Sequence, residues 1–305
     1  MNADAVRRAL GFIRDRQNSD GGWGYRPGRR SLVEPTGLCL AALAAGGGGA
    51  GASAGLDFLR SCRKSSGAVG IDPTDPEASW MAYAAILAFD ALGAADEARR
   101  LAEAALAMED ASGRFTADEV SSIAMTYRYD AAIRGWPWTP GTTAWVEPTA
   151  LFMIALVRAG ISPEHERLKS GVRLLVDRRV RSGGWNFGNP YSQTQELEAT
   201  PLSTALALAG LGAAGYPGER AAVREGLRYL AEALAGDVSA IALAWSALAL
   251  ECYPFGGPGR PDPVARLAGL QAESGGFRDN LVETALAALV LSGPGGLVGR
   301  RGRAG

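Results

Sequence analysis

The 305-residue sequence has a single histidine, His165, and only three cysteines, Cys39, Cys62 and Cys252. The cysteines are far apart and form no Cys-x-x-Cys pair, so the sequence predicts buried thiols in a reducing compartment rather than a disulfide framework. One histidine, in a charged segment, leaves too few ligands for a zinc site. We therefore expect no metal, no cofactor and a cytoplasmic protein.

Charge of one sign is also lacking, because 31 basic and 32 acidic residues leave a net charge of −1. This balance gives no reason to expect a nucleic-acid partner. Residues 1–16 carry charges throughout, so we expect no signal peptide. Two uncharged stretches, 35–55 and 199–218, are rich in Ala and broken by glycines. A membrane span needs about 20 predominantly apolar residues, so both stretches are interpreted as buried helices with their turns.

The common catalytic motifs are missing as well. The sequence has no P-loop, no Gly-x-Ser-x-Gly, no Cys/His pair and no Asp-Asp-x-x-Asp that could hold magnesium on a diphosphate. The nearest acidic cluster runs from Asp72 to Asp75. Its prolines and spacing predict a loop that enters a helix.

What the sequence does contain is a repeat. Segment 22–36 returns as segment 135–149 with eight of fifteen positions identical, and a worn copy begins at 184–190 and leads into 200–204. Each copy runs into an apolar stretch. Such self-similarity predicts a repeat architecture.

Amphipathic and apolar helices alternate along the chain, which predicts six pairs. The amphipathic helices are expected at 4–16, 53–63, 95–109, 164–178, 218–234 and 262–270. The apolar helices are expected at 35–46, 77–92, 148–160, 201–213, 238–250 and 281–292. Helices that are apolar all round need enclosure by others.

Six such pairs predict an all-α fold, an (α/α)6 toroid with six parallel inner helices inside six outer ones. An open solenoid is the alternative, but neither end of the chain has the polar cap that a solenoid needs, so closure is favoured. We expect one domain over 1–292, an extra helix within 116–134 and a disordered tail at 293–305.

The turns resemble the QW repeat of squalene–hopene cyclases and related triterpene cyclases, and the chain is also similar to the β-subunits of protein prenyltransferases. Four QW-like copies carry the likeness. They are Phe12-Ile13, Gln17 and Gly21-Gly22-Trp23; Leu267, Gln271 and Gly275-Gly276-Phe277; Phe58-Leu59, Arg63 and Gly67; and Leu174-Leu175, Arg179 and Gly183-Gly184-Trp185. Because such Gln side chains can bond a neighbouring helix end under an aromatic ring, we interpret Gln17, Trp23, Gln271 and Phe277 as structural staples.

The resemblance also implies an acid. Those cyclases take their proton from an Asp-x-Asp-Asp-Thr-Ala motif, and aligning its Thr-Ala places Glu147 on the proton-donating Asp. Pro148 and Trp145 replace the other two acids, so the full motif is absent. Glu34 is the same element in the first copy. A carboxylate at a helix N-terminus also has an ordinary explanation, since the helix dipole favours it by about 0.3–1 kcal/mol.

In a toroid, four acids that precede or begin inner helices would gather at one mouth, and we expect tryptophans on the adjoining loops. The acids are Glu34, Glu77, Glu147 and Asp237, and the tryptophans are Trp23, Trp80, Trp136, Trp138, Trp145 and Trp185. We expect the six tryptophans, with Glu77 and Asp237, to line the substrate pocket. Such a rim could bind a cation or steady a carbocation, because cation–π contacts contribute about 2 kcal/mol in a dry site.

Three functions stay open. The first is an isoprenoid-binding or terpenoid-cyclase-like protein, with Glu147 as acid and Glu34 as its partner. The second is a non-catalytic toroid that binds a lipid or peptide, and the third is a carbohydrate-active enzyme with paired carboxylates. Because cyclases of the resembling family have two such domains, a partner chain or a homodimer is considered.

Overall fold

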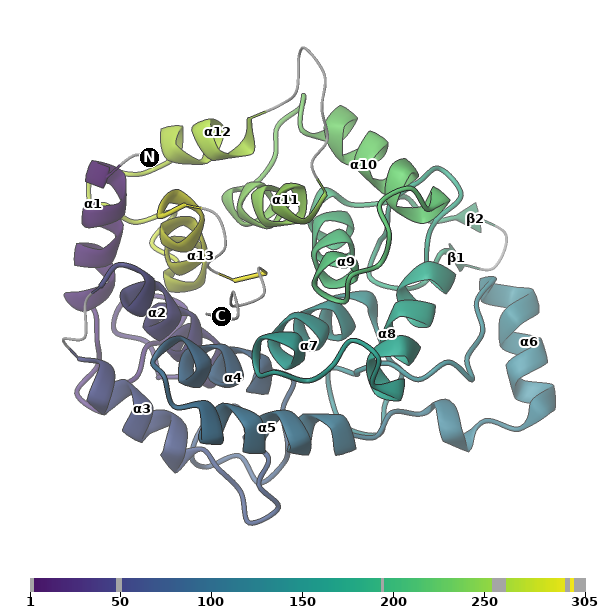
Figure 1. Cartoon of the computed structure of the whole chain (residues 1–305), viewed down its shortest axis with the longest axis horizontal. Coiled ribbons are helices and arrows are strands. Elements are labelled where there is room, and N and C mark those ends of the chain that lie inside the picture. Colours follow the sequence, from purple (N-terminus) through teal and green to yellow (C-terminus); the bar gives the residue numbers. More distant parts are fainter. Residues whose placement is uncertain (1–2, 48–50, 193–194, 254–261, 294–296, 299–305) are drawn as a thin grey trace, which may run out of the picture.

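The computed structural model describes residues 3–47, 51–192, 195–253, 262–293 and 297–298. These residues form thirteen α-helices, one turn of 3-10 helix at Ser112–Arg114 and a two-residue hairpin of strands β1 (Tyr191–Ser192) and β2 (Gln195–Glu196). Two concentric rings of helices account for nearly all of them (Figure 1).

Six helices form the inner ring. They are α2 (Val33–Ala45), α4 (Ala82–Ala91), α7 (Val146–Arg158), α9 (Pro201–Ala213), α11 (Ala240–Cys252) and α13 (Leu281–Leu291). Each contacts the next, and α13 contacts α2, so the ring closes. The predicted (α/α)6 toroid is therefore confirmed, and the open solenoid was the wrong alternative.

Six helices form the outer ring. They are α1 (Ala3–Arg14), α3 (Ala52–Ser61), α5 (Ala95–Ala107), α8 (Glu166–Asp177), α10 (Ala221–Ala233) and α12 (Pro263–Gly269). The difference between the rings follows from their sequences, because an inner helix such as α4 is buried along nearly its whole length and an outer helix such as α8 buries one face.

A repeated joint fastens the outer ring to the inner one. The indole N–H groups of three tryptophans donate to backbone carbonyls in the last turns of outer helices. The acceptors are Ile13 in α1 for Trp23, Ala105 in α5 for Trp136 and Leu175 in α8 for Trp185. All three tryptophans have no exposed surface. The expectation that Trp23, Trp136 and Trp185 line a substrate pocket was therefore wrong, whereas the staple interpretation of Trp23 fits its contacts.

Glycines of the outer helices leave room for these rings. A Cβ atom on Gly55, Gly171 or Gly226 would come within 3.1, 3.2 or 2.6 Å of an indole carbon. Gln17 completes the first joint, because its side-chain amide donates to the carbonyls of Gly21 and Gly51 over 2.8 and 2.9 Å.

Three parts of the chain refine the predictions. The extra segment contains helix α6 (Ala117–Tyr127), which lies outside both rings in Figure 1. The fourth helix begins at Ala82 rather than 77. Leu297 and Val298, in the segment expected to be disordered, are buried in the core, and the remaining residues of 294–305 lie outside the described part.

Candidate functional site

Loops between the rings cover the N-termini of inner helices. The backbone N–H of Leu281 donates to the carbonyl of Tyr25, that of Val33 to Ile71 and that of Val146 to Phe187, each over 2.9–3.0 Å. Each loop thus lies over the inner helix that precedes it in the ring. This arrangement places the first turns of these helices, and the acids they carry, beneath a rim of loops.

Glu34, in the first turn of α2, is buried and held on both oxygens. Tyr83 on α4 donates its hydroxyl to Oε1 over 2.7 Å, and the hydroxyl of Tyr25 donates to Oε2. Burial raises the pKa of Glu34, the negative charge of Glu147 raises it further, and the two phenol hydrogen bonds oppose the shift. The site therefore favours a protonated Glu34.

Glu147 occupies the matching position in α7 and is half-buried. The hydroxyl of Ser203 on α9 donates to its Oε1 over 2.9 Å. Burial raises the pKa of Glu147, and the bond from Ser203 opposes that shift. Glu34 and Glu147 lie in the first turns of α2 and α7, and the negative charge of Glu147 contributes to the raised pKa of Glu34.

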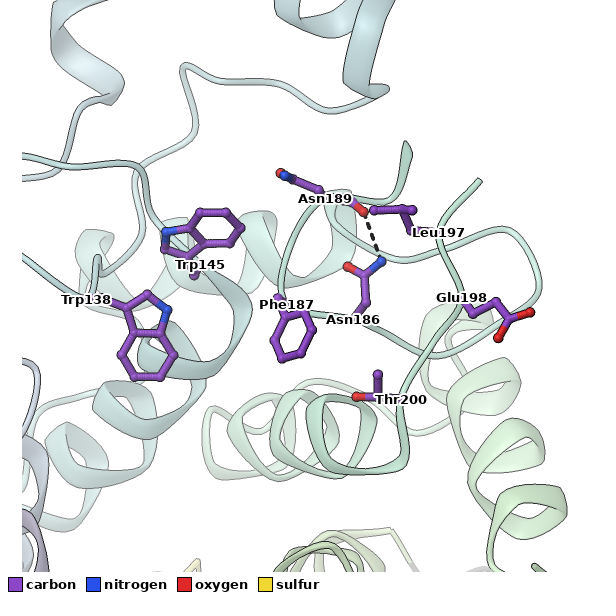
Figure 2. Close-up of a pocket in the computed structure, with 8 residues that line it drawn as sticks. All are labelled: Trp138, Trp145, Asn186, Phe187, Asn189, Leu197, Glu198 and Thr200. Atoms are coloured by element: carbon purple, nitrogen blue, oxygen red, sulfur yellow. Dashed lines mark hydrogen bonds between the residues drawn. The ribbon is translucent and has the colours of Figure 1, made fainter. Parts of the chain in front are cut away.

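A pocket of about 600 Å³ has Trp145, two residues before Glu147, in its wall, whereas Glu147 itself is not one of its lining residues (Figure 2). Four large apolar side chains and four polar ones line it: Trp138, Trp145, Phe187 and Leu197, with Asn186, Asn189, Glu198 and Thr200. The two tryptophans lie on one side and Leu197 and Glu198 on the other, with Phe187 between them. Phe187 is 60% exposed, which is unusual for a phenylalanine and leaves apolar surface free for a ligand.

The wall of this pocket continues toward Glu34 as a row of aromatic rings. Trp138 meets Trp80 edge to face, with ring centroids 4.6 Å apart, and Trp80 stacks on Tyr83 with centroids 6.0 Å apart. Tyr83 in turn donates to Glu34. Of the six predicted tryptophans, Trp138 and Trp145 line the pocket and Trp80 supports its wall.

The other two predicted acids do not share this setting. Glu77 is an exposed loop residue five positions before α4, and Asp237 is an exposed residue three positions before α11. The N-cap of α11 is Ser239, whose hydroxyl accepts from the N–H of Ala242. Both acids precede inner helices, as expected, but neither is among the residues that line the pocket.

Several side chains have structural roles that bear on other chemistry. His165 caps α8, because its Nδ1 accepts from the N–H of Arg167 over 3.1 Å. Asp72 holds its loop by accepting from the N–H and hydroxyl of Thr74 and the N–H of Asp75. Within the described residues, no three His, Cys, Asp or Glu side chains gather as metal ligands. Among those residues there is also no helix of the length and apolar character that a membrane crossing requires.

Sequence reasoning missed six of the eight residues that line the pocket, and it missed three hydroxyl donors to the two acids or their surroundings. The lining residues are Asn186, Phe187, Asn189, Leu197, Glu198 and Thr200, and the donors are Tyr25, Tyr83 and Ser203. Ser203 carried a signal, since aligning Thr204 with Thr149 places it on Pro148, in a first turn beside an acid. Tyr83 gave none, because its contact with Glu34 joins residues 49 positions apart.

No protein-family model matches the chain, and no curated protein matches it. Solved structures do share the fold. The type II terpene cyclase MstE from Scytonema has a TM-score of 0.63 at 14% identity, over 95% of this chain and 96% of that one. MstE has also been solved with its substrate, geranylgeranyl dihydroxybenzoate, and with its product, merosterolic acid A.

The fold also occurs in proteins with other activities. An α-amylase from Clostridium perfringens has a TM-score of 0.63 at 12% identity, over 96% of this chain and 98% of that one. A protein from Actinoplanes has a TM-score of 0.62 at 18% identity, over 95% and 98%. These likenesses define the class of fold, a toroid that terpene cyclases and carbohydrate-active enzymes both use, and the choice of function depends on the site.

Proposed function

We propose that this protein binds an isoprenoid in the pocket beside Glu147 and starts its cyclisation by proton transfer from that carboxyl. The observation that carries the proposal is the pair Glu34 and Glu147, two carboxyls in matching first turns, with Trp145, two residues before Glu147, in the wall of an apolar pocket. MstE, a cyclase that shares the fold, supports it by analogy.

The chemistry requires a carboxyl that is protonated before reaction and tolerated as an anion afterwards. Burial raises the pKa of Glu147 and so favours its protonated form, and the hydroxyl of Ser203 stabilises the carboxylate that remains. The faces of Trp138 and Trp145 offer cation–π contacts to the carbocation, worth about 2 kcal/mol in a dry site. Glu34, held by two phenols, is the fixed partner, and the charge that forms on Glu147 raises the pKa of Glu34.

The same contacts disfavour a glycosidase. Such an enzyme needs two carboxyl groups that reach one glycosidic bond. Both oxygens of Glu34 already accept hydrogen bonds from Tyr25 and Tyr83, so Glu34 is not available to a sugar or to a water that attacks one. The carbohydrate-active alternative therefore rests on the shared toroid and not on the site.

The test is product analysis with the purified protein and uncharged linear polyprenyl substrates, by gas chromatography and mass spectrometry. We expect cyclised product from the wild type and a loss of at least about 10²-fold in rate for Glu147→Gln, the usual contribution of a general acid. The thermal midpoint should stay near that of the wild type. Glu103→Gln, on the exposed face of α5, is the matched control and should keep full activity.

Three results would redirect the proposal. Full activity in Glu147→Gln would remove Glu147 as the acid. Saturable binding of a polyprenyl ligand without product from any substrate would favour the non-catalytic binding toroid. Cleavage of an oligosaccharide would restore the carbohydrate-active alternative.

A further inference from the structure

Two hydroxyl groups connect the pocket with Glu147. Thr200, which lines the pocket, donates its hydroxyl to Oγ of Ser203 over 2.9 Å. Ser203 donates its own hydroxyl to Oε1 of Glu147, also over 2.9 Å. Ser203 itself has no exposed surface. The chain of donors therefore starts at a surface that a ligand or water can touch and ends on the proposed acid.

Helix capping explains only one of the two hydroxyl groups in this series of hydrogen bonds. Thr200 is the N-cap of α9, and its hydroxyl accepts from the N–H of Ser203 over 3.2 Å. That bond accounts for the choice of threonine. It does not account for the hydroxyl of Ser203, whose bond crosses from α9 to α7.

The repeat makes the hydroxyl of Ser203 stand out. Aligned on the threonines that begin the inner helices, its position holds Pro35 in α2, Pro148 in α7 and Glu283 in α13. Among these four described helices, a hydroxyl occurs at this position only in α9, the helix that faces Glu147.

We infer that Thr200 and Ser203 form a proton relay that recharges Glu147 from the pocket. After Glu147 has given its proton to the substrate, the cyclised cation loses a proton to water in the pocket and hydronium forms. Ser203 transfers its hydroxyl proton to the Glu147 carboxylate and takes the proton of Thr200, and Thr200 takes one from that hydronium, which becomes neutral water again. One O–H bond forms on Glu147, each hydroxyl loses and regains a proton, and no net charge is left in the pocket. This inference rests on the proposed function of Glu147.

Glu34 has no such route, which sharpens the assignment. Its two donors, the phenols of Tyr25 and Tyr83, do not line the pocket, so neither connects Glu34 with the water there. Thr200 and Ser203 thus serve one carboxyl of the pair. They act through Glu147 and are proton-transfer residues rather than the acid itself.

The first experiment compares one turnover with many. Enzyme that starts protonated should complete its first turnover normally in Ser203→Ala and Thr200→Val, whereas later turnovers should slow on the order of tenfold or more, because recharging becomes limiting. Ser203→Thr and Thr200→Ser keep the hydroxyls and should restore the steady rate. Ser246→Ala, which removes another fully buried hydroxyl from an inner helix, is the matched control. Unchanged steady rates in both hydroxyl-deleting variants would overturn the relay.

The second experiment does not need turnover and separates the relay from the proposed function. Rapid mixing with D₂O shifts the infrared C=O band of a protonated carboxyl, and the band that Glu147→Gln removes reports Glu147. We expect this exchange to slow on the order of tenfold in Ser203→Ala and Thr200→Val and not in Ser246→Ala. Equal exchange rates in all proteins would overturn the relay whatever the product analysis gives. Slow exchange in the variants, together with no product from the wild type, would leave the relay standing and reject the cyclase.

Discussion

The two copies of the fifteen-residue segment, 22–36 and 135–149, build the same joint but different surroundings for their glutamates. In both copies, the backbone N–H of the tryptophan also donates to the hydroxyl of the final threonine over 2.9 Å. Trp23 donates to Thr36, and Trp136 donates to Thr149. The identical positions therefore maintain the fold.

The positions that differ decide what reaches the acid. Two residues after the tryptophan, the first copy has Tyr25, which donates to Glu34. The second copy has Trp138, which lines the pocket instead. The exchange of Tyr25 for Trp138 within the repeat, together with Tyr83 and Ser203 on the neighbouring inner helices, gives the two carboxyls different surroundings.

The largest expected effect would test whether the two joints are equivalent. Trp23→Ala and Trp136→Ala each empty a fully buried site and remove an indole hydrogen bond, so each should lower the free energy of unfolding by about 3–5 kcal/mol. Denaturant unfolding measures both. Trp138→Ala, at a partly exposed position in the loop of the second joint, should cost clearly less. A large loss of unfolding free energy in only one of the two buried-tryptophan variants would show that the two joints contribute unequally to stability.

A smaller effect would test how each copy meets the next inner helix. In the first copy, a Cβ on Gly37 would lie 2.4 Å from the backbone oxygen of Ala84. Gly37→Ala should therefore force α2 from α4 and cost about 1–3 kcal/mol in unfolding free energy.

The second copy has Ala150 in α7 where the first has Gly37 in α2. Here the glycine that allows close packing is Gly210 on the neighbouring helix α9, where a Cβ would lie 2.9 Å from Cα of Ala150. Gly210→Ala should then match Gly37→Ala, while Ala150→Gly should cost no more than about 1 kcal/mol, the difference in helix propensity. A tolerated Gly210→Ala would contradict this mirror relation.

The ring itself could be predicted because its cause is local: a helix that is apolar on all faces must lie inside one that is not. The residue at which α4 begins could not be predicted. Pro76 and Glu77 suggested a helix N-terminus, but Asp75 accepts from the N–H groups of Ile71 and Glu77, and those bonds hold a loop that continues to Ala82.

The roles of the tryptophans were hidden for a different reason. Residue type does not say which way a side chain faces. Trp23, Trp136 and Trp185 each follow a glycine, whereas Trp138 and Trp145 follow a proline and an alanine. The preceding residue therefore distinguishes the buried tryptophans of the joints from those that line the pocket, and this difference can be found in the sequence. The bond from Tyr83 to Glu34 was not, because it depends on two helices meeting in the closed ring.

The smallest expected effect concerns the sealed glutamate and pH. The pKa of Glu34 is raised above its ordinary 4.5, so the folded state binds the proton more tightly than the unfolded chain does. The stability that this contributes is complete below pH 4.5 and is lost as pH rises through the higher pKa of the folded state. Glu34→Gln removes this titration and should flatten the dependence of unfolding free energy on pH above about 4.5.

Tyr25→Phe sharpens the same test. It removes a donor that favours the carboxylate, so the pKa of Glu34 should rise further above its ordinary value. The loss of stability should then shift to higher pH, measured by chemical denaturation across a pH series. Trp138→Phe, at the matching position beside Glu147, removes no donor to a carboxyl and should leave the curve in place. An equal shift in both variants would mean that Tyr25 acts through packing, and the contrast between a sealed and an open copy would lose its electrostatic basis.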